Sequence, residues 1–216
     1  MILHILKLIK TNLYGNIWVL VELLVVFVVL WFTTDYFLMR GILANRPVGF
    51  DVENVYKVTL SMRPANAPSF VKYEDGSDEP RQNLYRIVDR IKAHPDVEAV
   101  CMSYVALPYT FSNWGIDIYH DSIHVSARSL NVTPEYFKVF DIHPASGGSA
   151  EELARRLPEG AIVSATTAQE LFGRTDVAGE RYYSMDSIGE PIIAVSEPLR
   201  NDEYATSGNI QLFGLL

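Results

Sequence analysis

The longest apolar run in the sequence lies at Ile17–Phe32, where fifteen of sixteen residues are apolar and Glu22 is the one charge. Carried on to Leu38, the segment has 22 residues. A helix of that length is about 33 Å long, enough to cross a hydrocarbon core of about 30 Å. A central charge costs about 3 kcal/mol on insertion, whereas each apolar residue gains about 0.3–0.6 kcal/mol. The pattern therefore predicts a transmembrane helix at residues 17–38.

Residues 1–16 place apolar side chains at helical spacing and two lysines, Lys7 and Lys10, on another face. This pattern predicts a short amphipathic helix along the cytoplasmic membrane surface, broken near Gly15–Asn16. The lysines before the span and Asp35 near its end favour a cytoplasmic N-terminus. A cleaved signal peptide is the alternative, but the apolar run is long for one and no small-x-small cleavage motif follows it. We expect an uncleaved anchor that holds the rest of the chain outside the cytoplasm.

Glu22 has two interpretations. An ionisable residue inside a span usually faces a helix bundle or a polar cavity and finds a partner there, which would give Glu22 a role in helix packing or coupling. Alternatively, Glu22 lies close enough to the cytoplasmic interface to reach water. The sequence leaves both open.

Beyond residue 45 the composition becomes more polar, and short strand and helix patterns follow one another. The strand patterns are Val55–Met62, Val97–Val105, Gly115–Tyr119, Ile123–Arg128, Ala161–Ser164, Arg181–Met185 and Pro191–Val195. The helical patterns are Leu84–Ile91, Thr133–Phe140, Ala150–Leu157 and Thr166–Phe172. The predicted fold class is α+β: a transmembrane helix, then a mixed α/β domain with a strand–helix–strand half and a smaller strand-rich subdomain.

Local signals fix some of these boundaries. Thr133 is expected to cap a helix that has Pro134 at its first position, and Gly173 is expected to end the Thr166–Phe172 helix. The last two strand patterns are expected to pair around Gly189.

Charge and composition exclude some functions. Residues 46–216 carry a formal charge of about −9, which argues against binding to nucleic acid or to an anionic lipid surface. The single cysteine, Cys101, lies in an apolar run and is expected to be a core residue rather than a nucleophile.

No phosphate-binding, dinucleotide-binding, serine-hydrolase or zinc-protease motif occurs. His120 and His124 flank a predicted hairpin turn, so a metal site there is disfavoured. The paired acids lie in predicted loops or at helix starts, where solvation and capping explain them. We expect no catalytic, cofactor-binding or metal-binding residue and no enzymatic activity. An anchored hydrolase is the disfavoured alternative.

Several segments in a fixed order resemble one family. They are Pro47–Val55, His94–Val100, Val132–Phe140, Val163–Gly173, Val177–Gly179 and Ile193–Val195. The order resembles the MacB-like periplasmic core domain of bacterial ABC transporter permeases, which is related to the FtsX and lipoprotein-releasing permeases. Two positions depart from its pattern: Asp96 replaces a usual glycine and Ser164 a usual asparagine.

The resemblance implies a permease of the exporter or mechanotransmission type, in the bacterial inner membrane, with its main domain in the periplasm. The implied partners are the lipid bilayer, a cytoplasmic ABC ATPase subunit, a second permease copy (as a homodimer or pseudo-dimer) and a periplasmic protein. It also implies structural roles for Gly49, Phe50, Pro95, Thr133, Pro134, Tyr136, Phe137, Gly173 and Gly179. A single-pass periplasmic sensor or protein-binding module is the alternative.

The expected organisation is a cytoplasmic segment at 1–16, a transmembrane helix at 17–38 and a periplasmic core domain at 46–216. Family members carry further domain elements and three more helices, so the domain is expected to be incomplete at its C-terminus, as a fragment or a natural truncation. Residues 212–216 are too few to span a membrane.

Overall fold

The computed structural model describes residues 13–61, 63–110, 114–184, 187–200 and 208–214. The chain divides into two compact units, Met1–Arg46 and Pro47–Leu216. Each unit is described by itself.

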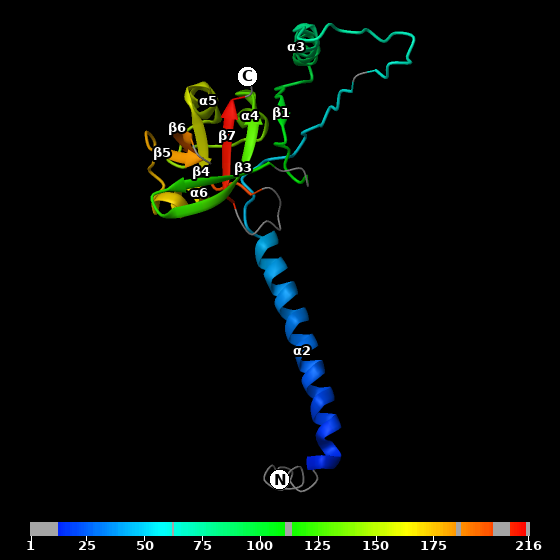
Figure 1. Ribbon diagram of the computed structural model, residues 1–216, viewed down its shortest axis with the longest axis vertical. Helices are drawn as coiled ribbons and strands as arrows, with labels where there is room; N and C mark the ends of the chain where they lie inside the picture. The colour runs from blue at the N-terminus through cyan, green and yellow to red at the C-terminus, as the bar shows by residue number, and fades with distance from the viewer. Residues whose placement is uncertain (1–12, 62, 111–113, 185–186, 201–207, 215–216) are drawn as a thin grey trace. The chain divides into compact units, whose positions relative to one another are not determined.

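The first unit contains one long helix, α2 (Leu13–Ala44), drawn in blue in Figure 1. Within it, Ile17–Ala44 is long and apolar enough to cross a membrane. The break expected near Gly15–Asn16 is wrong, because the helix runs through these residues, and residues 1–12 of the expected amphipathic helix lie outside the described chain. At the C-terminal end of α2, the Asn45 side-chain amide donates to the carbonyl of Gly41 at 2.7 Å, which satisfies one of the last helical acceptors.

The second unit is built on one sheet. Its strands are β1 (Ser103–Tyr104), β2 (Gly115–His120), β3 (Ile123–Val132), β4 (Ala161–Ser164), β5 (Arg181–Ser184), β6 (Ser187–Ser196) and β7 (Ile210–Gly214). The seven described strands lie in the order β1-β3-β2-β5-β6-β4-β7, and a parallel β3–β7 pair closes the ring. Six of these strands form the ring, in which each strand has a neighbour on both sides, an arrangement that avoids edges open to unwanted pairing. Among the described strands, β1 pairs with β3 alone and lies outside the ring.

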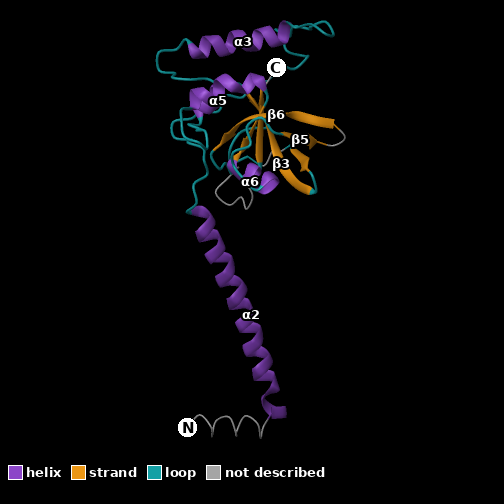
Figure 2. Ribbon diagram, turned by 90° about the vertical axis from the view of Figure 1, so that its left-hand side faces the viewer, coloured by secondary structure: helices purple, strands orange, loops and turns teal. Residues whose placement is uncertain are grey.

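Three of the four described helices of this unit (α4, α5 and α6) pack against the sheet, whereas α3 has no buried residue. The helices are α3 (Glu79–Lys92), α4 (Glu135–Val139), α5 (Ala150–Arg156) and α6 (Ala165–Phe172), with a 3₁₀ turn at Leu157–Glu159. Helices α4 and α5 share one buried cluster with Ile162, Ile210 and Leu212 of the sheet. Helix α6 packs Ala168 and Leu171 into a second cluster. Figure 2 shows α5 and α6 at opposite ends of the strands.

Several sequence predictions are confirmed. The chain is an apolar helix followed by a mixed α/β domain, as the predicted fold class requires. The β2–β3 hairpin and strand β4 form where expected. Helix α6 ends at Gly173, which has a left-handed φ of 71° that suits glycine.

Three strand predictions need correction. No described residue of Val55–Met62 is in a strand, and Val97–Val105 contributes only Ser103–Tyr104. Val55–Met62 alternates as a strand does but finds no pairing partner among the described residues, and a strand needs one. Within Val97–Val105, Ser103 and Tyr104 pair with β3, and the described residues of the rest of the segment find no strand partner. Gly189 is not the hairpin turn; it lies inside β6, where its backbone passes close to the Tyr182 ring.

Strand β7 carries a polar side chain in the core. Gln211 is fully buried, and neither amide atom has a hydrogen-bond partner among the described residues. Because an unsatisfied buried amide costs about 1–3 kcal/mol, Gln211→Met is expected to raise the melting temperature by a few degrees. Thermal unfolding of the full chain in detergent, followed by circular dichroism, measures this. Gln82→Met at an exposed site should change nothing, and a lower melting temperature for Gln211→Met would show that this amide is satisfied.

Candidate functional site

The candidate site is centred on α4. Here Thr133 does not act as expected: Pro134 occupies the N-cap position, and no side chain caps the helix. The Thr133 hydroxyl oxygen instead accepts from the backbone N–H of Met102 at 3.0 Å, and the Thr133 N–H donates back to the Met102 carbonyl at 3.0 Å. Thr133 therefore joins the start of α4 to a distant segment rather than closing its own helix.

Aromatic side chains of α4 form its buried face. Tyr136 and Phe137 are both fully buried, and the rings of Tyr136 and Phe140 lie 4.6 Å apart. The Tyr136 hydroxyl donates to the carbonyl of Ala106. Burial raises the pKa of Tyr136 well above its ordinary value, so the phenol stays a donor at any physiological pH.

The segment that follows α2 binds this aromatic face. Phe50 meets Tyr136 and Phe140 edge to face, with ring centroids 6.4 and 5.8 Å apart, an arrangement worth about 0.5–1.5 kcal/mol per pair beyond area burial. The N–H of Asp51 donates to the carbonyl of Phe140 at 2.9 Å, which satisfies an acceptor at the end of α4.

A second contact holds the same segment from the other side. The Arg200 N–H donates to the carbonyl of Val48 at 2.8 Å, and the guanidinium Nε donates to that of Pro47 at 3.3 Å. Gly49 has a φ of +80° and lies so close to Pro198 that any Cβ would collide with that carbonyl oxygen. We call residues 47–51, 133–140 (α4 with the residues that flank it) and 198–200 the linker clip.

The start of α4 also binds the chain at the far end of a long segment, residues 52–101. Residues 52–101 leave the linker clip at Asp51 and rejoin α4 through Met102, which bonds to Thr133. Val55 and Cys101 pack against the same buried cluster as the α4 aromatics. One short helix thus fixes the start of the domain and both ends of residues 52–101, which we call the lobe.

Cys101 behaves as a core thiol. Burial, followed by the charge of Glu135, raises the pKa of the Cys101 thiol from 9.0 to about 11. Because the thiolate is the reacting form, this shift alone should slow alkylation at pH 8 about 100-fold relative to an ordinary cysteine. The rate should rise about tenfold per pH unit up to about pH 11. Iodoacetamide labelling measured by mass spectrometry checks this, with the urea-unfolded chain as the control; fast labelling of the native chain would contradict it.

The structure brings together some of the residues singled out in the sequence. Gly49, Phe50, Thr133, Pro134 and Tyr136 meet in the linker clip, with Phe137 packed beneath. The others lie elsewhere: Glu22 in α2, Pro95 after α3, Gly173 at the end of α6 and Gly179 in the turn before β5.

Sequence reasoning missed Pro198 and Arg200 as clip residues. Arg200 and Pro47 are 153 positions apart, so no local pattern connects them.

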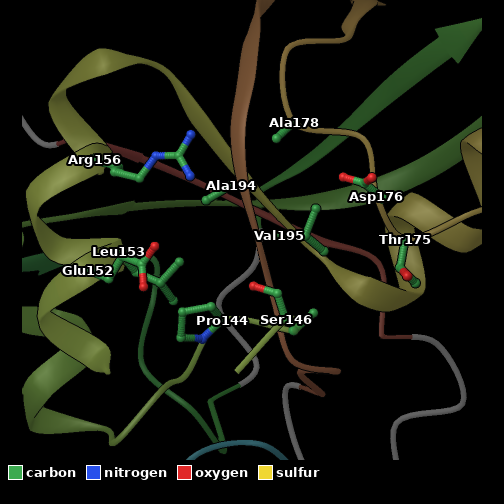
Figure 3. A pocket seen from close by; sticks show the side chains of 11 residues that line it. Pro144, Ser146, Glu152, Leu153, Arg156, Thr175, Asp176, Ala178, Ala194 and Val195 are labelled. Atoms are coloured by element: carbon green, nitrogen blue, oxygen red, sulfur yellow. The ribbon is translucent and has the colours of Figure 1, made fainter. Parts of the chain in front are cut away.

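A small cavity of about 180 Å³ lies between α5 and β6 (Figure 3). Charged side chains of both signs line it: Glu152 and Arg156 from α5, and Asp176 from the loop after α6. Among the described residues, no cluster of three histidine, cysteine, aspartate or glutamate side chains could hold a metal. His124 pairs with Asp117 at 3.2 Å, and His120 lies against the Phe172 ring. These contacts account for both histidines as residues that stabilise the hairpin region.

The described chain thus combines an apolar helix long enough to cross a membrane with a mixed α/β domain that carries the linker clip. The family model for the MacB-like periplasmic core domain matches residues 24–200. The chain therefore belongs to the MacB-like periplasmic core domain family, the domain of ABC-type transporter permeases. A search of curated proteins found no match.

The chain is similar to several solved structures, including two from bacteria. One is the extracellular domain of the noncanonic ABC-type transporter YknZ from Gram-positive bacteria, with 15% identity, 59% of each chain covered and a TM-score of 0.41. The other is the periplasmic region of MacB from Actinobacillus actinomycetemcomitans, with 9% identity, 55% of this chain and 52% of that chain covered and a TM-score of 0.40. The chain thus spans between half and three-fifths of their lengths.

Proposed function

We propose that this chain is the N-terminal part of an ABC transporter permease of the exporter or mechanotransmission type. In this proposal, residues 17–38 cross the inner membrane with residues 1–16 on the cytoplasmic side. Residues 46–216 form the periplasmic core domain and relay movement driven by a separate ATPase. The linker clip is the observation that carries the proposal.

The physical argument concerns the length of the tether. Helix α2 ends at Ala44 and the clip begins at Pro47, so Asn45 and Arg46 alone separate them. The three Cα–Cα steps from Ala44 to Pro47 span at most about 11 Å. A larger displacement of the end of the helix must therefore pull on the clip.

The clip has a route onward through α4. Phe50 packs on Tyr136 and Phe140, and Asp51 bonds to the Phe140 carbonyl. Thr133 bonds to Met102, and Tyr136 bonds to Ala106, in the segment that follows the lobe. A displacement of Phe50 would therefore be transmitted to the lobe through one packed aromatic cluster. Packed interiors transmit strain because they have little free volume.

A longer tether tests the relay. Eight Gly-Ser residues would be inserted between Asn45 and Arg46 of the full chain, reconstituted with its ATPase in lipid vesicles. The readout is the ATP-dependent change in distance between spin labels at Gln82→Cys on α3 and Arg155→Cys on α5, in a Cys101→Ser background. We expect the insertion to abolish this change. The same insertion after Gly76, an exposed loop residue, should preserve it, and an unchanged response with the long tether would refute the relay.

The uncovered face of α3 favours a second candidate, a single-pass periplasmic sensor or protein-binding module. No residue of α3 is buried, and Leu84 and Ile87 are each 38% exposed. An apolar helix face of this kind can bind a protein partner. The gene sequence following residue 216 discriminates: three further apolar spans support the permease, and a signalling domain supports the sensor.

A further inference from the structure

The small cavity between α5 and β6 brings together charged groups of both signs. Its walls carry the Arg156 guanidinium and the carboxylates of Glu152 and Asp176 (Figure 3). Among the described residues, no hydrogen bond or ion pair is made to any of these three charged groups. Glu152 and Arg156 are four positions apart on α5, a spacing at which opposite charges can pair on a helix. Because they do not pair, both charges are free to bind a ligand.

The walls of this cavity are held in place by contacts of their own. The Ala145 N–H donates to the carbonyl of Val195 at 2.9 Å, which holds residues 144–146 against β6. In the loop after α6, Arg174 forms an ion pair with Glu180 at 2.6 Å. A ligand would therefore enter a site that is already formed, which lowers the entropic cost of binding.

The size of the cavity limits the ligand. Its volume of about 180 Å³ is below the about 300–1,000 Å³ of pockets for drug-sized ligands, and equals the volume of about six water molecules. In Figure 3, Arg156 and Asp176 lie on opposite sides of Ala194, whose short side chain leaves the space between them open. The ligand must therefore be small and lie between a cation and carboxylates.

We propose that this cavity binds a free amino acid, as a small zwitterion. A guanidinium binds a carboxylate through two parallel hydrogen bonds, which assigns the carboxylate of the ligand to Arg156. An ammonium group donates three hydrogen bonds and carboxylates accept them, which assigns the ammonium group of the ligand to Glu152 and Asp176. An amino acid carries both groups on one carbon atom, so a ligand of this size contacts both signs of charge.

Ligands with a single charge suit the cavity less well. A simple anion bound to Arg156 would be repelled by the two carboxylates, and a simple cation bound to the carboxylates would be repelled by Arg156. A divalent metal ion is disfavoured for a second reason, because no group of three metal-binding side chains is present among the described residues. The cavity shares no residue with the linker clip, so its occupancy is separate from the proposed relay.

Equilibrium dialysis of the full chain in detergent tests whether a zwitterion binds. The probe is radiolabelled L-alanine, and the competitors are unlabelled L-alanine, acetate and methylammonium. L-alanine should compete at least about tenfold more strongly than either single-charge ligand, because each of those lacks one set of charge-assisted hydrogen bonds. Absence of L-alanine binding, or equal competition by acetate or methylammonium, would overturn the proposal.

Substitutions on α5 test where the amino acid binds. Arg156→Met should weaken L-alanine binding at least about tenfold, whereas Arg155→Met, at the neighbouring exposed residue that does not line the cavity, should leave it unchanged. Glu152→Gln should also weaken binding, with Glu151→Gln as its control. Melting temperatures measured without ligand show that each variant is folded. Unchanged binding by both cavity variants, or an equal loss in the two controls, would overturn the proposal.

Discussion

Replacement of Gly49 by alanine is expected to cost about 2–4 kcal/mol of unfolding free energy and to lower the melting temperature by about 10 °C. Two effects add. Gly49 has a φ of +80°, a conformation that alanine rarely adopts, and its Cβ would collide with the carbonyl oxygen of Pro198 and lie 2.8 Å from Leu199 Cδ2. The full chain in detergent, unfolded thermally and followed by circular dichroism, gives the measurement.

Gly76 provides a matched control. It has nearly the same φ, +81°, but a Cβ there would meet no atom within 4 Å. Gly76→Ala should therefore show the conformational cost alone, about 1 kcal/mol. The difference between the two variants measures the contact between the clip and Pro198. Equal losses in both would mean that this close approach is absent in solution.

The sequence predicted elements whose boundaries depend on near neighbours. Strand β4 and helix α6 were placed within one residue, because an apolar run, a polar junction and a terminal glycine all agree there. The Ser164 hydroxyl accepts from the N–H of Thr167 and so caps α6, which makes this junction local. The β2–β3 hairpin was found for the same reason.

Elements that depend on distant partners were missed or misread. Strand β7 lies between β3 and β4, yet Ile210–Gly214 offers only five residues, including a polar Gln211 and a glycine. Its stability comes from two neighbours that lie far away in the sequence. The reverse holds for Val55–Met62, where alternation predicted a strand that finds no partner among the described residues.

At the candidate site, too, local contacts were predicted better than contacts with distant residues. Phe50 and Tyr136 were singled out through the family resemblance without any prediction that they touch, and the structure places their rings in contact. Thr133 was assigned a capping role because its sequence context fits one, but its hydroxyl oxygen accepts from Met102, 31 positions away. The capping rule considers neighbouring residues alone, so it could not predict that a distant backbone N–H would bind this hydroxyl instead.

Tyr136 is expected to be the most sensitive position of the linker clip. Its side chain is fully buried, contacts the rings of Phe50 and Phe140, and donates to the Ala106 carbonyl. Tyr136→Ala should cost about 3–5 kcal/mol, because it leaves a cavity and removes the hydrogen bond. Tyr136→Phe keeps the ring but leaves the carbonyl without its donor, and should cost about 1–2 kcal/mol. Urea unfolding of the full chain in detergent gives both values.

The same two variants separate the role of Tyr136 as a junction from its role in packing. Tyr136→Ala frees both Phe50 and the segment at Ala106 that follows the lobe, so trypsin should cut within the lobe several-fold faster in native buffer. Tyr136→Phe should change this rate much less, because the ring still holds Phe50. Tyr85→Ala, at a residue 41% exposed on α3, serves as the surface control. A Tyr136→Ala chain with unaltered lobe cleavage would show that α4 does not connect the linker to the lobe.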